Sequence, residues 1–244
     1  TVKHTEEFVW SEFKTECDYA FAEFKKSNPD KVLDSNNFYL VGEVYNYGIS
    51  GGKFFDFGDK KVNYYDNMFT QQINFEFKWN AKELAYETLF RKYDYKLNNE
   101  LKGYSVLNYL TSHDDGSPFD PERKHPKKTA TLLLLSPGAS QVYYGDESAR
   151  SLVIDGTVGD ATLRSLMNWD ELPQKQDILI HWQKLGQFRN NHPAIGAGKH
   201  KVISESPYVF SRTYSKDNYN DAIIVAFDDS QTNISIDVSS VFKD

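Results

Sequence analysis

The first patterned segment of the chain is apolar at every third or fourth position. Between residues 5 and 27, the apolar residues with this spacing are Phe8, Val9, Phe13, Cys17, Phe21 and Phe24. Such spacing places the apolar side chains on one face of a helix. The turn-forming sequence SNPD comes next, at residues 27–30, and it is typical of a helix end. We therefore predict an amphipathic helix from Thr5 to about Ser27.

Further along, short apolar runs alternate with helical patterns. The run NFYLVGE, residues 37–43, has no polar alternation, which is typical of a strand buried on both faces, as in a parallel sheet. Further strands are predicted at 73–77, 104–110 and 140–144, and helices at about 81–97, 127–135 and 174–190. This alternation of helix and strand indicates βα units around a parallel sheet.

The pattern changes near Lys199. Three segments, SPYVFSRTY (206–214), DAIIVAFDD (221–229) and NISIDVSS (233–240), are short, rich in β-branched residues and separated by polar residues. They predict antiparallel strands of a second, all-β domain. These strands are too few for a complete sandwich, so we expect this domain to be incomplete.

Composition and charge exclude several classes of protein. With 244 residues the chain can form one large α/β domain or two smaller ones, and 39% hydrophobic with 26% charged residues argues against disorder. No run of 18 apolar residues is present, so no membrane span is predicted. A net charge of −7 argues against nucleic-acid binding. The single cysteine, Cys17, excludes an intrachain disulfide and a cysteine-built zinc site.

Aromatic residues are abundant, at 15% of the chain. Most of them are expected in the core. Tyrosines in polar surroundings, however, suit a surface that stacks on flat apolar faces and offers hydroxyl groups. Sugar rings, peptides and bases are all possible partners of such a surface.

Two carboxylates follow predicted parallel strands. Glu43 comes directly after FYLVG, and Asp114 comes after VLNYLTSH. The carboxyl ends of parallel strands meet at one edge of a sheet, where α/β enzymes carry their active sites. A pair of acids there suggests glycoside hydrolysis. The alternative is that each acid caps a helix or pairs with a lysine.

The neighbours of the two acids suggest different roles. Glu43 follows an apolar strand and is flanked by Val44 and Tyr45, whereas Asp114 lies beside His113 in a polar loop. An apolar setting favours a protonated carboxyl and a polar one an ionised carboxylate. Glu43 is therefore predicted as the proton donor and Asp114 as its ionised partner.

Five segments resemble, in family order, motifs of the α-amylase family of glycoside hydrolases (family 13). They are GEVYNYG (42–48), YLTSHDD (109–115), SPGASQVYYGDE (136–147), LRSLMNWDE (163–171) and LGQFRNNHPAIGAG (185–198). The resemblance implies a partial (β/α)8 TIM barrel, from about the end of strand 4 through helix 8, in residues 1–198. The incomplete antiparallel β-sandwich domain then begins at residue 199.

The resemblance also implies a reaction. It is the retaining hydrolysis of α-1,4-glucans such as starch and maltooligosaccharides, which uses two carboxyl groups about 5 Å apart. Glu43 would be the general acid/base, Asp114 the stabiliser of the transition state, and His113 a ligand of sugar hydroxyls. Arg164 and Trp169 would organise the loop that follows strand 8.

Aromatic residues after Glu43 form a second group of candidates. Tyr45 is predicted to bind substrate. Tyr47, Phe54 and Phe55 lie in the same loop. They either line outer sugar subsites or pack inside the protein, and the sequence favours neither.

The first four residues, TVKH, resemble the end of the strand-four motif Gly-Phe-Arg-x-Asp-x-x-Lys-His. The resemblance implies that Lys3 and His4 contact substrate and that the Asp nucleophile would directly precede Thr1. We therefore expect a fragment that lacks the nucleophile and is inactive alone. The alternative is a non-catalytic carbohydrate-binding or interaction module derived from an amylase barrel.

Further expectations follow from the same resemblance. No cofactor and no metal site are predicted in this chain, while calcium is possible in a full-length parent. The expected location is extracellular, periplasmic or at the cell surface. Half a barrel would also expose two sheet edges, so self-association through those edges is predicted.

Overall fold

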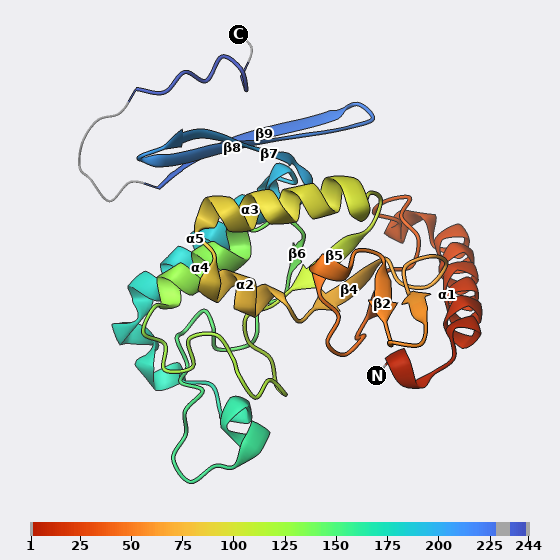
Figure 1. Cartoon of the computed structure of the whole chain (residues 1–244), viewed down its shortest axis with the longest axis horizontal. Helices are drawn as coiled ribbons and strands as arrows, with labels where there is room; N and C mark the ends of the chain where they lie inside the picture. The colour runs from red at the N-terminus through yellow and green to blue at the C-terminus, as the bar shows by residue number, and fades with distance from the viewer. Residues whose placement is uncertain (1, 228–234, 243–244) are drawn as a thin grey trace.

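The computed structural model describes residues 2–227 and 235–242, and its centre is a four-stranded parallel sheet (Figure 1). The strand order is β1-β4-β5-β6, and every neighbouring pair is parallel. The strands are β1 (Val41–Gly42), β4 (Gln71–Asn74), β5 (Ser105–Asn108) and β6 (Ala139–Ser140). The predicted parallel sheet is therefore confirmed.

Helices accompany this sheet along the chain. They are α1 (Glu7–Ser27), α2 (Phe77–Glu83), α3 (Tyr86–Tyr95), α4 (Pro126–Leu135), α5 (Gln176–Asn191) and α6 (Ala194–Ala197). A π-helical turn, Lys96–Glu100, extends α3, and a small antiparallel pair, β2 (Phe54–Asp56) and β3 (Lys61–Asn63), follows β1. Helices α1, α4 and α5 begin within two residues of their predicted starts.

The interior combines apolar packing with a polar pair between strands. Leu133 of α4, Phe90 of α3 and Val106 of β5 are fully buried members of one cluster. Each such side chain contributes about 1.5–3 kcal/mol on burial. Between the strands, the Asn74 amide donates to the Asn108 side-chain oxygen at 2.8 Å. Because both amides are buried, this bond satisfies groups that would otherwise destabilise the sheet.

A separate antiparallel sheet lies over α3 (Figure 1). It is formed by β7 (Lys199–Glu205), β8 (Tyr208–Lys216) and β9 (Tyr219–Phe227), in that order. The ring of Phe210 on β8 packs edge-on against Phe90 on α3, 5.4 Å between centroids. The predicted change of architecture at about residue 199 matches the start of β7, whereas a domain boundary at that point stays a prediction.

The strand predicted at 73–77 is wrong over its second half. Strand β4 ends at Asn74, and α2 begins at Phe77. The Phe75 N–H donates to the carbonyl of Tyr47 at 2.9 Å, in the loop after β1. The Glu76 carboxylate accepts hydrogen bonds from Ser50 and from Asn80. These bonds to distant residues end the strand and turn the chain into a helix.

Several other predicted elements are shorter than expected. The strand predicted at 37–43 comprises only Val41–Gly42, and the strand predicted at 104–110 only Ser105–Asn108. The helix predicted at 81–97 is interrupted between Glu83 and Tyr86, so that α2 and α3 are separate. The strand predicted at 140–144 stops at Ser140, because the chain then enters a turn in which the Asp146 N–H bonds to the Tyr143 carbonyl.

The last predicted strand is also not observed where the chain is described. Residues 235–240 contain no strand, while 228–229 and 233–234 lie outside the described residues.

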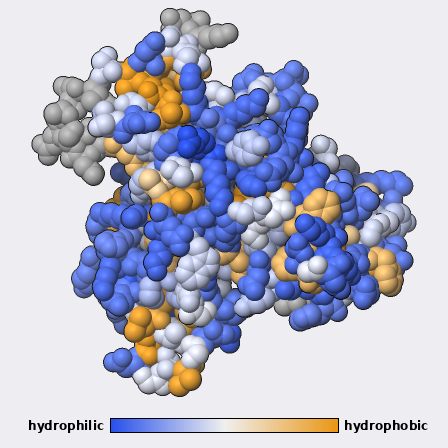
Figure 2. Space-filling view, in the orientation of Figure 1, coloured by the Kyte–Doolittle hydropathy of each residue, from blue (hydrophilic) through white to orange (hydrophobic). Residues whose placement is uncertain are grey.

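The surface is mostly hydrophilic, with exposed apolar side chains in a few places (Figure 2). One group is in the loop between β6 and α5, namely Val153, Ile154, Val158 and Leu166. Another is on α1, where Phe8, Phe13 and Phe24 are exposed. Strands β1 and β6 are the edges of the parallel sheet, and self-association through them stays a prediction. Within residues 2–227 and 235–242, no helix is long and apolar enough to cross a membrane.

Candidate functional site

Glu43 lies directly after β1, at the carboxyl end of that strand. Its side chain is half-buried. Its carbonyl accepts the Val2 N–H at 3.1 Å, which joins the start of the chain to this strand end. The preceding residue must be small, because a Cβ on Gly42 would lie 2.9 Å from the ring of Phe69. The close ring packing thus explains the glycine before this acid.

Asp114 lies in the loop that follows β5, and local hydrogen bonds shape that loop. The Ser112 hydroxyl donates to Asp114 Oδ1 at 3.0 Å. The Thr111 hydroxyl is bound by the buried carboxylate of Asp146, at 2.7 and 2.8 Å from its two oxygens. His113 Nε2 lies 3.7 Å from Asp114 Oδ2, and both side chains are exposed. The loop therefore presents these two predicted residues to solvent.

Arg164 secures the same loop from outside. Its Nε donates to the His113 carbonyl at 2.9 Å. This contact is with the loop after β5, whereas the predicted role of Arg164 was to organise the loop after strand 8, and that role stays a prediction. Trp169 is largely exposed, and no ring contact of it occurs among the described residues.

A buried ion pair next to Asp114 was not predicted from the sequence. Lys78 of α2 donates to Asp115 Oδ1, and the Ser117 N–H donates to the same oxygen at 3.0 Å. Both side chains of the pair are nearly inaccessible to solvent. The doubled acid in SHDD was the available signal, but its partner is 37 residues away in sequence.

Tyr109 connects the two strand ends. Its ring lies 5.7 Å from that of Phe75, which lies 5.3 Å from that of Tyr45, both edge-on. Burial raises the pKa of Tyr109, and the negative charges of Asp115, Asp114 and Glu43 raise it further. These carboxylates therefore lie within electrostatic reach of one buried phenol. The structure brings Glu43 and Asp114 to the same end of the sheet.

Lys3 joins the aromatic group beside Glu43. Its Nζ lies 5.5 Å from the ring centroid of Tyr45 and 4.6 Å from that of Phe55. The Trp10 indole N–H donates to the Val2 carbonyl at 3.1 Å and holds this turn against α1. His4 follows Lys3 in the same short helical turn and is exposed.

The aromatic residues after Glu43 divide into two groups. Tyr45 and Phe54 are exposed. Tyr47 is buried, donates to the Gly52 carbonyl at 2.7 Å and accepts from the Tyr65 hydroxyl at 3.1 Å. Tyr47 therefore packs inside the protein and does not line a sugar subsite.

Metal-ligating side chains are not clustered within residues 2–227 and 235–242. Nowhere in that part of the chain do three or more His, Cys, Asp or Glu side chains come together to hold an ion. Calcium in a longer parent protein stays a prediction.

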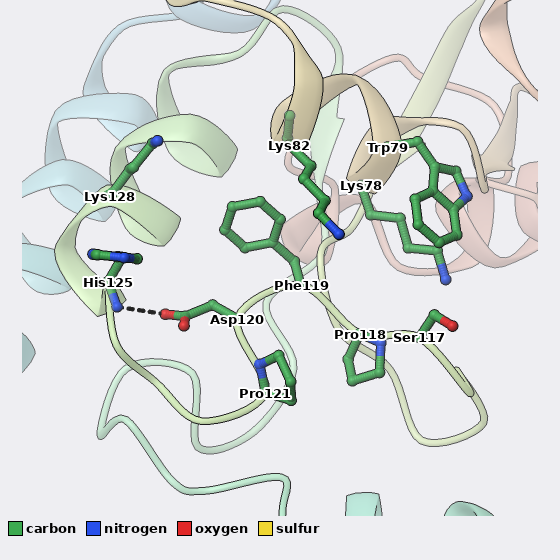
Figure 3. Close-up of a pocket in the computed structure, with 11 residues that line it drawn as sticks. Lys78, Trp79, Lys82, Ser117, Pro118, Phe119, Asp120, Pro121, His125 and Lys128 are labelled. Carbon is green, nitrogen blue, oxygen red and sulfur yellow. Dashed lines mark hydrogen bonds between the residues drawn. The ribbon is translucent and has the colours of Figure 1, made fainter.

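A pocket of about 470 Å³ opens beside the Asp114 loop (Figure 3). Its walls come from α2, from the start of α4 and from residues 117–121 of the loop. None of the predicted catalytic or substrate-binding residues lines it.

Comparisons with known proteins point to one family. The chain is 38% identical over 224 residues to the periplasmic alpha-amylase of Escherichia coli strain K12, covering 89% of this chain and 30% of that protein. It is 25% identical over 210 residues to the alpha-amylase SusG of Bacteroides thetaiotaomicron, covering 70% of this chain and 28% of that protein. The chain thus spans less than a third of the length of these relatives. No protein-family model matches it.

Solved structures share the fold. A structure titled AmyP in complex with maltose matches with a TM-score of 0.56 and 17% identity, over 91% of this chain and 52% of that one. A cyclomaltodextrinase matches with a TM-score of 0.54 and 19% identity, over 91% of this chain and 35% of that one.

Proposed function

The chain belongs to the α-amylase family of glycoside hydrolases, and on this premise we propose that it forms part of the catalytic domain of a retaining α-1,4-glucan hydrolase. Its substrates are starch and maltooligosaccharides. The parallel sheet is the second half of a (β/α)8 barrel, from about the end of strand 4 through helix 8. The observation that carries the proposal is the position of Glu43 and Asp114, which follow the parallel strands β1 and β5 of one sheet.

Glu43 acts as general acid and then as general base. In its protonated form it donates a proton to the glycosidic oxygen, and afterwards it removes a proton from the attacking water. Its position directly after β1 supports this role, because α/β enzymes carry catalytic residues at the carboxyl ends of parallel strands.

Asp114 and His113 bind the sugar ring at the reacting carbon. An ionised Asp114 stabilises the positive charge that develops in the oxocarbenium-like transition state. His113 hydrogen-bonds the hydroxyl groups of the same sugar. Support comes from their exposure on a loop that Arg164 and the Lys78–Asp115 pair hold in place, since a site needs a fixed first layer of residues.

The substrate continues over Tyr45, with Lys3 and His4 beside it. Tyr45 is exposed and packs on Phe75, and Lys3 lies over its ring. An aromatic ring with nearby donors binds a sugar through its apolar face and its hydroxyls together.

The nucleophile of the retaining reaction comes from a residue that precedes Lys3 in the family motif. In the alignment of TVKH with Asp-x-x-Lys-His, none of the 244 residues occupies the position of this aspartate. We therefore propose that these 244 residues alone do not hydrolyse glucans, because loss of a covalent nucleophile commonly costs on the order of 10⁴ or more in kcat.

The parent protein acts outside the cytoplasm, in the periplasm, at the cell surface or in the medium. Support for this location is the similarity to an enzyme that is named as periplasmic.

The proposal is tested by comparing two polypeptides on maltoheptaose. The 244-residue chain is expected to give no turnover. A polypeptide in which the reading frame continues upstream of Thr1 into Gly-Phe-Arg-x-Asp is expected to be active, and Glu43→Gln should lower its kcat by about 10²–10⁴. Lys184→Gln, at an exposed position on α5, is the control and should leave kcat unchanged.

Two outcomes would contradict the proposal. Hydrolysis by the 244-residue chain that Glu43→Gln abolishes would overturn its inactivity. A start codon beside Thr1, together with glucan binding that Glu43→Gln and Asp114→Asn leave unchanged, would instead identify a non-catalytic binding module.

A further inference from the structure

The pocket beside the Asp114 loop has the size of a small-molecule site. Its volume is about 470 Å³, within the range of roughly 300–1,000 Å³ that ligand pockets occupy. Helix α2 and the first turn of α4 form two of its sides, and residues 117–121 form the wall that connects them (Figure 3). None of the residues to which the hydrolase reaction is assigned lines it, so its lining needs a separate explanation.

The charged residues of this lining are three lysines and one aspartate. Lys82, Lys128 and His125 all line the pocket. The side-chain ammonium groups of Lys82 and Lys128 form no ion pair and no hydrogen bond with any other residue of the described chain. Lys78 also lines the pocket, but its ammonium group is bound to Asp115. On a chain with a net charge of −7, a concave surface with two unpaired lysines favours an anion.

The acid of the lining does not neutralise these lysines by contact. Asp120 is bound by the backbone instead, where its two oxygens accept the Lys124 N–H at 2.8 Å and the His125 N–H at 2.7 Å. The carboxylate therefore holds the loop against the start of α4. Figure 3 shows this bond between Asp120 and His125, with the lysine side chains on either side of Phe119.

The rest of the lining is apolar and flat. Phe119, Pro118 and Pro121 form the loop wall, and Trp79 stands at the α2 side with 44% of its surface exposed. Rings of this kind pack against the C–H faces of a sugar. An inorganic anion alone would leave these faces unused, and a neutral sugar would leave the lysines unused.

We propose that this pocket binds a phosphorylated sugar, with its phosphate at the lysine side chains of the lining and its sugar ring against Phe119. The lysine ammonium group binds phosphate as a compact positive charge. It does not need the planar, two-bond geometry by which arginine binds a carboxylate or a phosphate. The ligand is a glucose phosphate or a phosphorylated unit of a glucan chain.

The pocket is next to the candidate active site. Residues 117–121 continue the loop that carries Asp114, and Lys78 links the pocket lining to Asp115. A phosphorylated unit bound there would hold its chain beside the catalytic loop. The binding itself does not depend on the proposed hydrolase activity.

The test is calorimetric titration of the 244-residue chain with glucose 6-phosphate, glucose, glucuronate and inorganic phosphate. Glucose 6-phosphate is expected to bind at least roughly tenfold more tightly than each of the other three. The double variant Lys82→Gln/Lys128→Gln should weaken its binding by roughly tenfold or more. Phe119→Ala should weaken glucose 6-phosphate but not inorganic phosphate.

A matched control has the same change in net charge. Lys184→Gln/Lys201→Gln removes two exposed lysines that form no ion pair within the described chain and lie outside this pocket, and it should leave binding unchanged. Circular dichroism checks the fold of each variant.

Three results would overturn the proposal. In the first, glucose binds as tightly as glucose 6-phosphate. In the second, inorganic phosphate or glucuronate binds as tightly as glucose 6-phosphate. In the third, the two double variants weaken the binding of glucose 6-phosphate equally. Because every readout is binding, a failure of the hydrolase proposal leaves this test unaffected.

Discussion

Two histidine–carboxylate pairs in this molecule have the same chemistry but different surroundings. At the strand ends, His113 Nε2 lies 3.7 Å from Asp114 Oδ2, and the side chains are 66% and 46% exposed. At the junction of α3 with the antiparallel sheet, His200 Nε2 lies 2.9 Å from Glu87 Oε2, and the side chains are 2% and 23% exposed. The first pair is open to a ligand, whereas the second is closed by protein.

The closed pair belongs to a network that joins the antiparallel sheet to helices α3, α4 and α6. Arg212 Nε donates to His200 Nδ1 at 3.2 Å, so the histidine is neutral and donates from Nε2 to Glu87. Arg212 also donates to the carbonyls of Leu135 and Ile195, at 2.6 and 2.5 Å. The Tyr208 hydroxyl donates to the same Glu87 oxygen at 2.9 Å.

The difference shows that burial, rather than residue type, separates a structural pair from a candidate catalytic one. In the junction the polar groups of His200, Glu87 and Tyr208 bond to other protein groups, and Arg212 does so through Nε and Nη1 while its buried Nη2 has no partner among the described residues. At the strand ends the polar groups keep unused hydrogen-bonding capacity towards solvent. Four tests, taken from the largest expected effect to the smallest, examine this contrast.

Arg212→Met should destabilise the protein most. It removes a buried cation that bonds two carbonyls and His200, and leaves these acceptors without a partner. Each buried acceptor left without a partner costs about 1–3 kcal/mol, so we expect the free energy of unfolding to fall by about 3–5 kcal/mol in all, measured by urea denaturation. Arg164→Met, at the open loop, is the control and should cost less than about 0.5 kcal/mol. Equal losses for the two arginines would contradict the contrast.

Asp115→Asn and Asp114→Asn compare neighbouring acids. Asp115 is buried against Lys78, and removing its charge leaves that lysine unpaired in the interior. The expected loss in unfolding free energy is about 1.5–3 kcal/mol. Asp114→Asn is expected to change it by less than about 0.5 kcal/mol, although it removes the proposed transition-state stabiliser. Thermal melting of both variants decides the point, and a large loss for Asp114→Asn would show that its role is structural.

His200→Ala and His113→Ala compare the two pairs directly. The first leaves Glu87 and Arg212 without their shared partner inside the protein, which should cost about 1–3 kcal/mol of unfolding free energy. The second removes an exposed ring and should cost less than about 0.5 kcal/mol. Chemical denaturation of the matched variants measures both. A stability loss at His113 as large as that at His200 would remove the distinction.

The pH dependence of stability should follow the closed pair. Burial lowers the pKa of His200, an effect that outweighs the hydrogen bond to Glu87. The unfolded chain, with a histidine pKa of about 6.5, then binds the proton more readily than the folded chain. The free energy of unfolding is therefore expected to fall as the pH drops below about 6.5.

Substitutions identify which histidine makes the free energy of unfolding depend on pH. His200→Gln should flatten this pH dependence, and His113→Gln should leave it unchanged. His181, whose pKa burial also lowers, contributes in the same direction and accounts for a residual slope. Denaturation curves between pH 7.5 and 5.5 measure the effect, and a slope that His200→Gln leaves intact would contradict the assignment.

Several features of the site could be predicted from local sequence. The strand at 104–110 and the helix at 127–135 have apolar patterns long enough to be recognised, and the structure contains both. The position of Glu43 and Asp114 after strands also follows from such patterns. The strand end at Asn74 could not be predicted, because it depends on a bond from Phe75 to Tyr47, 28 residues earlier in the chain.

By itself the sequence determined most of the order of helices and strands, the family and the acids placed after two strands, since these depend on neighbours within a few residues. Only the tertiary structure decided that Asp115 pairs with Lys78 while Asp114 faces solvent, and that Tyr47 packs while Tyr45 is exposed. It also decided that Lys82 and Lys128, 46 positions apart in the numbering, line one pocket. Exposure and pairing depend on which distant segments meet in space, and no local pattern of residues specifies that.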